Sequence, residues 1–440
     1  MGRGSMRTGG RGSMGARASV AGLGIMLLVL AGCTSPNGTT PGLDVLESRA
    51  PRAAVAVTDV PVAAAATVAA ASGLGARLMD AAPDENLVVS PISVLVAFGM
   101  LREGAATTTA AELDAVLGFP AEQRGEAMNA LLRQLELHDG DPGEVPAGEV
   151  PDVPVLRVAD QVFLQEGFAV QQPFLDALAT HYGANAVQVD FTATGRAGGR
   201  AVVDDWVAEH TGGQIEAAPV PFDRSTRLAL LNTVYLAAAW QEPFGDGTSL
   251  GQFHRPDGTM ATARFLEETR DLAYFVGADG AAAVRIPYTA DFAMDVVLAP
   301  EGRWAPAGWP AVAAGLDAAA GAPVPVELTL PTWEHTTSLD LRSMLREAGL
   351  SETLGVAPDL SGIAPGLYVS AAAHEATITV DSAGTVAAAV TSVAVGEASA
   401  EVTPDAVVFR ADRPFAYRIV HLPTAVPVFM GQVVDPGEGE

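Results

Sequence analysis

Helix-like patterns occur mainly early in the chain and strand-like patterns mainly late, and this order limits the classes of fold that the chain can adopt. Ala-rich or amphipathic stretches predict helices at Pro61 to Met79, Ser93 to Leu101, Ala110 to Leu117, Gly125 to Leu137, Gln172 to Tyr182, Arg200 to His210 and Leu339 to Ala348. Apolar runs predict strands at Val155 to Leu164, Leu228 to Leu236, within Ala281 to Leu298 and at Val324 to Leu330, with more strands closing the chain. This segregated order predicts an α+β fold with large mixed or antiparallel sheets.

The N-terminus carries the pattern of an export signal. Four arginines precede an apolar run from Ser19 to Leu30, which is too short to span a bilayer comfortably. The run ends in Leu-Ala-Gly-Cys33, which resembles the lipobox of a bacterial lipoprotein, with an ordinary secretory signal as the alternative. We therefore expect residues 1–32 to be a removed signal peptide and Cys33 to carry the lipid anchor. Residues 33–60 begin rich in Ser, Thr, Gly and Pro, and they predict a flexible linker.

The composition argues against several classes of function. Hydrophobic residues make up 49% of the 440 residues, which supports a large apolar core. The net charge is -27, so we expect no nucleic-acid partner, because phosphate binding needs a basic surface. The single Cys excludes an intramolecular disulfide and a Cys-based zinc site, and the seven His are scattered without a close ligand pair. We therefore expect no metal and no cofactor.

One short motif raises the possibility of hydrolysis. Gly247 to Gly251 reads GTSLG and fits the G-x-S-x-G pattern of a nucleophile elbow around Ser249. A nucleophile elbow needs a buried strand directly before it and a helix directly after it, whereas turn-rich sequence flanks this motif. We therefore do not expect the chain to be an enzyme.

A set of longer motifs occurs in a fixed order along residues 61–436. The most distinctive are NLVVSPISVLVAFGM at Asn86 to Met100, LNTVYLAAAWQEPF at Leu231 to Phe244, LYVSAAAHEATITVD at Leu367 to Asp381 and Arg413-Pro414-Phe415. Their order and spacing resemble those of the serpin family. The resemblance predicts one serpin domain over residues 61–440, with three β-sheets, eight to nine helices and an exposed reactive centre loop.

The resemblance also implies a function. Serpins are suicide inhibitors of serine proteases, and sometimes of cysteine proteases. The protease cleaves the reactive loop, is trapped as an acyl-enzyme, and is carried across the molecule as the loop inserts into the main sheet as a new strand. For this chain we expect a monomeric inhibitor that forms a covalent complex with a serine protease. We expect it to contact a membrane only through its lipid anchor, on the outer face of a bacterial cell envelope.

The segment that would insert resembles the inhibitory hinge of the family. Its residues are small and uncharged, so that they can be buried between two strands: Gly384, Thr385, Val386, Ala387, Ala388, Ala389, Val390 and Thr391. The family usually has Glu at the position of Ser382, so an ion pair at the top of the sheet is absent here. Because a partly exposed pair contributes at most about 1 kcal/mol, we expect a changed insertion rate and not a loss of function.

Family spacing from Gly384 predicts the scissile bond between Ala398 and Ser399. Ala before the bond implies an elastase-like or subtilisin-like target, and a register shifted by one residue would instead place Glu397 before the bond. The resemblance also assigns Ser90, Ser93, Asn232 and His374 to the shutter beneath the strands that must part, and Trp240 to the breach where insertion begins. The alternative to inhibition is a non-inhibitory serpin that acts as a binding or chaperone module.

Overall fold

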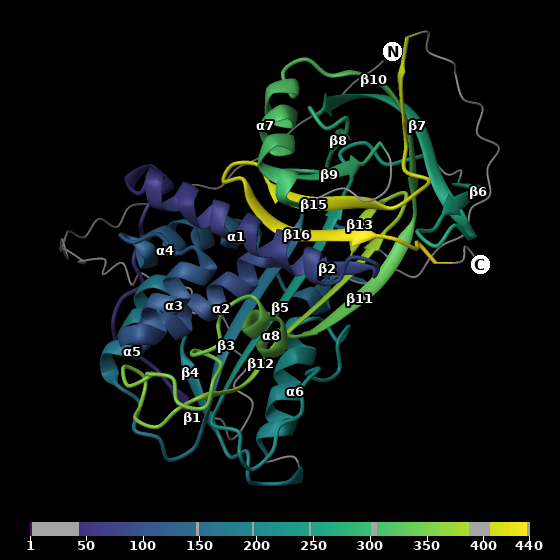
Figure 1. The fold of residues 1–440 in the computed structure, drawn as a ribbon. Coiled ribbons are helices and arrows are strands. Elements are labelled where there is room, and N and C mark those ends of the chain that lie inside the picture. The colour runs from purple at the N-terminus through teal and green to yellow at the C-terminus, as the bar shows by residue number, and fades with distance from the viewer. Residues whose placement is uncertain are drawn as a thin grey trace. The chain divides into compact units, whose positions relative to one another are not determined.

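The structure is a computed structural model that describes residues 1, 44–146, 149–195, 198–245, 248–300, 306–386 and 405–437. In these residues the helices are α1 (Pro61–Ala81), α2 (Pro91–Glu103), α3 (Thr107–Leu117), α4 (Arg124–Leu135), α5 (Gln172–Ala177), α6 (Gly199–His210), α7 (Trp309–Ala319) and α8 (Leu341–Glu347). Most α-helices precede most strands, as predicted, and α7 is a helix that the sequence patterns did not indicate. The α+β class is confirmed (Figure 1).

A seven-stranded sheet, here called the main sheet, forms one layer of the fold. Its order is β1 (Asp44–Leu46), β4 (Ala186–Val189), β3 (Val155–Gln165), β5 (Leu228–Ala239), β13 (Gly384–Val386), β12 (Val369–Val380) and β11 (Trp333–Asp340). The central strands β5 and β12 run parallel and pair directly along part of their length. At the other end of β5, the short strand β13 lies between them and is antiparallel to both.

The remaining strands form a nine-stranded network. It contains β14 (Val407–Arg410), β10 (Val324–Pro331), β7 (Met260–Val276), β8 (Ala282–Pro287), β9 (Phe292–Leu298), β15 (Phe415–His421), β16 (Val426–Val433), β2 (Leu87–Val89) and β6 (Thr248–His254). The 17-residue strand β7 pairs with β6 and β10 through its first part and with β8 through its last four residues. The network therefore divides at β7 into two sheets. Together with the main sheet, they make up the three sheets that we expected.

The N-terminal part of the folded body begins earlier than the sequence indicates. Residues 44–60 fall in the segment that we expected to be a flexible linker, but β1 pairs with β4 at the edge of the main sheet. Farther along, the backbone N–H of Ala53 donates to the carbonyl of Thr180, and that of Val55 donates to Asn129. Residues 44–60 are therefore held by backbone hydrogen bonds. The signal peptide and Cys33, apart from Met1, lie outside the described residues.

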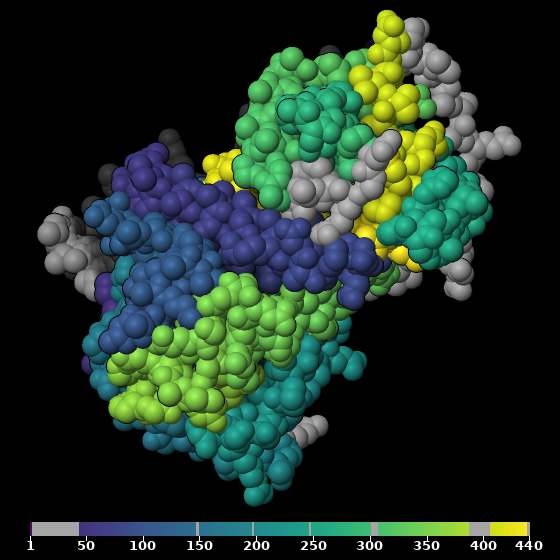
Figure 2. Space-filling view, viewed as in Figure 1, coloured from purple at the N-terminus to yellow at the C-terminus, as the bar shows by residue number. Residues whose placement is uncertain are grey.

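Helix α1 packs between the early helices and the strands that close the chain. It contacts α2, α4 and β16, and Figure 2 shows segments from the start and the end of the described chain lying against one another on this face. Among the described residues α1 is long and apolar enough to cross a membrane, but its side chains Leu74, Leu78 and Met79 are buried in the core. The apolar character of α1 is therefore explained by its packing in the folded body.

Candidate functional site

Strand β13 occupies the place where the two central strands of the main sheet separate. Gly384 pairs with Ala239 and Thr385 with Ala238 on β5, while Thr385 and Val386 pair with β12. The side chains of Thr385 and Val386 are buried. Successive side chains of a strand point to opposite faces of its sheet. Val386 accordingly packs on Tyr235 and Ala237, whereas Thr385 faces the other side.

Trp240 and Tyr288 form the floor beneath this entry point. Their rings stack with centroids 4.2 Å apart and an interplanar angle of 8°, and both side chains are buried. The indole Nε1 of Trp240 donates to the carbonyl of Asp381, and its backbone N–H donates to the carbonyl of Ala383, at 2.8 and 2.9 Å. The hydroxyl of Tyr288 lies 2.5 Å from that of Thr385. Trp240, which we assigned to the breach, therefore lies at the start of β13.

The turn that leads into β13 is held by the side-chain carboxylate of Asp381 and by backbone hydrogen bonds. The carboxylate of Asp381 accepts hydrogen bonds from the N–H groups of Ala383 and Gly384 at 2.8 and 3.1 Å. The carbonyl of Ser382, at the position where the family usually has Glu, accepts from the backbone N–H of Phe244 at 2.9 Å. These contacts, two of which are to the carboxylate of Asp381, fix the turn without a charged side chain at residue 382.

Gly384 is required at its position because the backbone of β5 passes very close. A Cβ built on Gly384 would lie 2.2 Å from the carbonyl oxygen of Ala238 and 2.8 Å from the Cα of Ala239. Both atoms belong to the main chain of a central strand, so they cannot move aside as a flexible side chain could. Only glycine allows β13 to enter here without displacing β5.

The four side chains that we assigned to the shutter lie together under β5 and β12. The ring Nε2 of His374 accepts a hydrogen bond from the backbone N–H of Ser90 at 2.9 Å, and its Nδ1 contacts the side-chain oxygen of Asn232. Ser90 also accepts from the N–H of Ser93 as the N-cap of α2. Burial lowers the pKa of His374 to about 3, so the ring is neutral at neutral pH. Their role in sheet opening stays a prediction.

A carboxyl group that the sequence did not single out adjoins this cluster. Asp160 on β3 is the pairing partner of Asn232 on β5, and it accepts a hydrogen bond from the hydroxyl of Ser93 at 3.3 Å. Removal from water raises the pKa of Asp160 well above its usual value, which favours the protonated acid. The side-chain NH₂ of Asn232 is buried and has no hydrogen-bond partner. The cluster is therefore incompletely satisfied in this conformation.

Several assigned residues lie outside the described residues: Ala387, Ala388, Ala389, Val390, Thr391, Ala398, Ser399 and Cys33. Sequence reasoning also missed Tyr288, because a lone tyrosine at a strand end carries no signal of its contact with Thr385. Sequence reasoning also missed a third group of residues, for a similar reason. The seven His suggested no metal site, yet folding brings His138 and His421 close to Asp291 from distant parts of the chain.

Comparison with known proteins agrees with the family resemblance of the sequence motifs. A family model described as "Serpin (serine protease inhibitor)" matches residues 66–436. An uncharacterised serpin-like protein of Thermococcus kodakarensis is 28% identical over 81% of this chain and 82% of the relative. Plasminogen activator inhibitor 1 of Sus scrofa is also 28% identical, over 82% of this chain and 89% of the relative.

Solved structures show the same fold. A complex of thyroxine-binding globulin with thyroxine superposes with a TM-score of 0.71 at 22% identity, covering 85% of this chain and 99% of that one. The native state of tengpin, a thermophilic serpin, superposes with a TM-score of 0.68 at 22% identity, covering 84% and 94% of the two chains.

Proposed function

The chain belongs to the serpin family, and on that basis we propose that it inhibits serine proteases by inserting its cleaved reactive loop into the main sheet. The observation that carries the proposal is the position of β13. Its three residues already lie between β5 and β12: Gly384 pairs with β5, Val386 pairs with β12, and Thr385 pairs with both. Further insertion would extend an existing strand, which avoids the costly first step of separating two paired strands.

The register of β13 determines which residues the main sheet would absorb. Continued one residue at a time, it pairs residue 395 with Leu228, at the far end of β5, and residue 396 with Val369, at the far end of β12. Every residue from Gly384 to Val395 is Gly, Ala, Val, Ser or Thr, so none would bring a charge or a bulky ring into the sheet. The run of small, uncharged loop residues is therefore as long as the strands between which it would insert.

The same register carries Thr391 into the shutter. It would pair with Asn232 on one side and with His374 on the other, and separate the two residues that touch in the present conformation. Alternation from Thr385 turns Thr391 toward the same face as those two side chains. A hydroxyl inserted there can replace the lost contact and reach the unpaired NH₂ of Asn232. Insertion would thus satisfy a buried polar group that the closed sheet leaves unsatisfied.

The predicted scissile bond, between Ala398 and Ser399, would lie just beyond the residues that insert into the main sheet. Ala398 follows Val395 closely, so after full insertion it would lie just past the far end of β5. Alanine before the bond suits a protease with a small or shallow apolar primary pocket, such as an elastase-like or subtilisin-like enzyme. A cut after Glu397 would point to a Glu-specific protease, and mass spectrometry of the cleaved chain distinguishes the two registers.

We also propose that the inhibitor is tethered to the outer face of a bacterial cell envelope through Cys33. The arginine-rich start, the apolar run and the lipobox-like sequence support this proposal. Replacing Cys33 with Ser should release the protein from membranes into the soluble fraction. Retention of the Cys33→Ser protein on membranes would contradict it.

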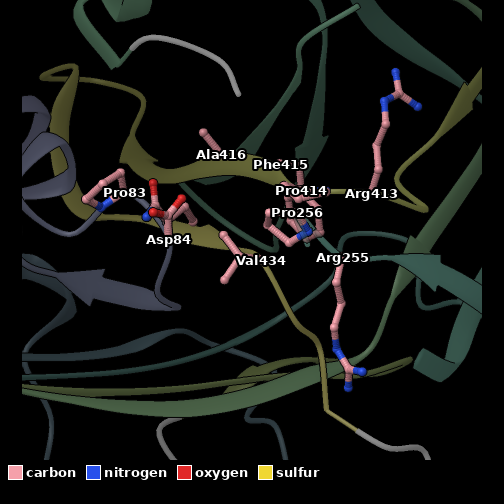
Figure 3. Close-up of a pocket in the computed structure, with 10 residues that line it drawn as sticks. Pro83, Asp84, Arg255, Pro256, Arg413, Pro414, Phe415, Ala416 and Val434 are labelled. Atoms are coloured by element: carbon pink, nitrogen blue, oxygen red, sulfur yellow. The ribbon is translucent and has the colours of Figure 1, made fainter. Parts of the chain in front are cut away.

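A non-inhibitory binding protein is the second candidate, and a pocket of about 290 Å³ is the observation that favours it. The pocket is lined by Pro83, Pro256 and Phe415 together with Arg255 and Arg413 (Figure 3). One structural neighbour is a thyroxine-binding globulin in complex with thyroxine, so this fold can hold a small ligand. In Figure 3 the two arginine side chains extend in opposite directions, and Arg255 is paired with Asp435, so the pair does not form a clamp for an anion.

One experiment separates the candidates. The purified protein is incubated with an elastase and with a subtilisin, and the products are resolved by denaturing electrophoresis. An inhibitor gives a covalent complex that survives SDS, and its cleaved form gains heat stability because the loop has become a strand. Loop cleavage without a complex and without a gain in heat stability would reject inhibition in favour of the binding function.

A further inference from the structure

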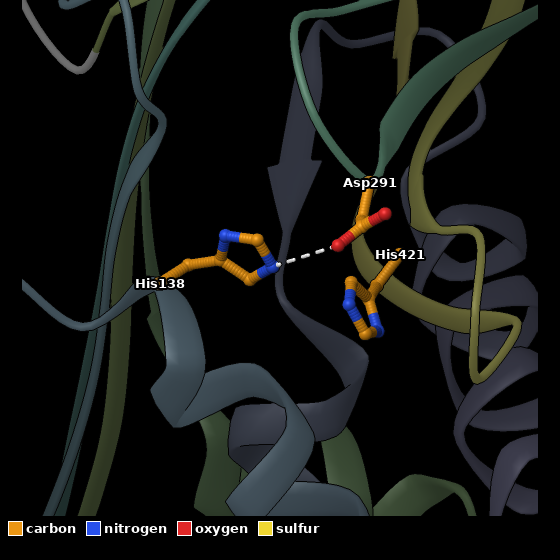
Figure 4. Close-up of side chains that lie close together, drawn as sticks. All are labelled: His138, Asp291 and His421. Carbon is orange, nitrogen blue, oxygen red and sulfur yellow. Dashed lines mark ion pairs between the residues drawn. The ribbon is translucent and has the colours of Figure 1, made fainter.

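Three potential metal ligands converge at one end of the second sheet, the part of the nine-stranded network from β7 to β2. His138 ends the 3-10 turn that follows α4, Asp291 directly precedes β9, and His421 ends β15. One ligand atom from each residue lies within 4.8 Å of the others (Figure 4). The three residues are more than 100 positions apart in the sequence, so only the fold brings them together.

The framework around the three side chains is ordered by strand pairing. His421 is the register partner of Phe292 across β15 and β9, and the backbone N–H of Leu422 donates to the carbonyl of Asp291 at 2.8 Å. The ring of Phe292 packs against both imidazoles, with centroids 4.8 Å from His138 and 5.3 Å from His421. The two histidines are 8% and 1% exposed. Their rings are therefore held in place before any ligand arrives.

The ring nitrogens are available for coordination. The Nε2 of His138 is buried without a hydrogen-bond partner and lies 3.6 Å from a carboxylate oxygen of Asp291. The Nδ1 of His421 lies 2.8 Å from the hydroxyl of Thr424, so its Nε2 is the atom that faces the cluster (Figure 4). A partner on the second ring nitrogen is typical of histidines that bind metals, because it fixes the tautomer.

We propose that His138, Asp291 and His421 bind one zinc ion, with a fourth position open to water. Two imidazole nitrogens and a carboxylate oxygen form a ligand set that suits Zn²⁺. Bonds of about 2.0–2.2 Å in a tetrahedral arrangement place neighbouring ligand atoms about 3.4 Å apart. The 3.6 Å separation of His138 and Asp291 is already close to that value. The other two separations are at most 4.8 Å, so small side-chain rotations would complete the site, and the 55% exposed side chain of Asp291 is the freest to move.

A bound ion would join two parts of the fold. Asp139, next to His138, forms a bridge with Leu156 at the start of β3 and an ion pair with Arg157. His421 and Asp291 belong to the second sheet. Zinc would therefore link the start of a main-sheet strand to the second sheet, and it should raise the thermal unfolding midpoint as its concentration increases.

The test is a calorimetric titration of Zn²⁺ into the full chain after treatment with EDTA. All proteins carry Cys33→Ser, so that the thiol cannot bind the metal. We expect one zinc per chain in this background, and at least about tenfold weaker binding in H138A and in D291A. D291A alters a largely exposed side chain, so it tests the site even if H138A fails to fold. The matched control is H254A, because His254 is an exposed histidine outside the cluster.

The outcomes are distinct. Loss of the stoichiometric site in D291A and H138A, with zinc binding by H254A unchanged, supports the proposal. A visible absorption band after Co²⁺ replaces Zn²⁺ also supports it, provided that the band is seen only in the proteins that keep the site. Binding in D291A and H138A equal to that of the Cys33→Ser background would overturn the proposal, as would loss of binding in H254A alone. Absence of stoichiometric binding in the Cys33→Ser background itself would also overturn it.

Discussion

The hydroxyl of Thr385 lies 2.5 Å from the hydroxyl of Tyr288, and both side chains are buried beneath the entry point of β13. Thr385 is the second residue of β13 and of the predicted hinge, and Tyr288 stacks on Trp240, the residue assigned to the breach. The contact joins the first inserted residues to a fixed part of the core. The contact explains why a polar residue is tolerated in a strand whose other two residues are Gly and Val, because the buried hydroxyl of Thr385 has a hydrogen-bond partner.

Removal of the tyrosine hydroxyl should loosen the hinge. In Y288F the buried Thr385 hydroxyl loses its partner, so β13 should leave the sheet more often and the stability of the native state should fall by about 1 kcal/mol. Limited proteolysis near residue 384 measures the exposure of the hinge. The control is Y368F, which removes a tyrosine hydroxyl bonded to the carbonyl of Ser225 and far from the hinge. Equal hinge exposure in Y288F and Y368F would argue against this function of Tyr288.

A methyl group on Gly384 should slow insertion. The Cβ in G384A would collide with the backbone of Ala238, so the cleaved loop would enter the sheet more slowly than water attacks the acyl bond. We expect more molecules of inhibitor to be cleaved for each protease molecule trapped. Gly321 is a suitable control, because nothing lies within 4 Å of a Cβ built there. The stoichiometry of inhibition should rise in G384A and stay unchanged in G321A.

Acid should destabilise the native state through buried histidines. The pKa of His374 is lowered to about 3, so below its unfolded value of about 6.5 only the unfolded chain takes up the proton. Stability from this group is complete above pH 6.5 and falls by about 1.4 kcal/mol per pH unit below it. His335, with its pKa lowered to about 4, contributes in the same direction. Urea unfolding midpoints between pH 6.5 and 5 measure the slope, which should be smaller in H374Q.

The carboxyl of Asp160 should have the opposite pH dependence. Because its folded pKa is raised, the unfolded chain releases its proton first as the pH rises above about 3.8, and stability falls from there upward until the folded pKa is reached. Asparagine has a similar shape and no charge to bury. D160N should therefore unfold at a higher urea concentration than the parent at pH 7, with no difference near pH 4. A lower midpoint at pH 7 would show that the carboxyl itself stabilises the shutter.

The ordered motifs identified the family and the fold class because long apolar runs, caps and turn residues carry their meaning locally. The helix predicted at Ser93 to Leu101 is an example, since its apolar pattern lies within α2 (Pro91–Glu103). Contacts between distant residues carry no such signal. The pairing of Asp160 with Asn232, the stacking of Tyr288 on Trp240 and the approach of His138 to His421 depend on how strands align in three dimensions.

A further limit of the sequence concerns where the folded body begins. Residues 33–60 were predicted to be a linker because the segment begins polar and turn-rich, at residues 34–42, and composition reports solubility better than it reports the edge-strand pairing of residues 44–46. Three residues of β1 are enough to fix this segment to β4, because an unpaired sheet edge offers backbone hydrogen bonds to almost any sequence.

Strands β5 and β12 have the same length, 12 residues each, and β13 enters at one end of both. Under the insertion that we propose, the sheet would therefore accept a fixed number of loop residues, whatever their identity beyond small size. Residues after that number could then change without any effect on how the sheet closes. In such a molecule the choice of target and the trapping step can evolve separately, provided that the distance between Gly384 and the scissile bond stays constant.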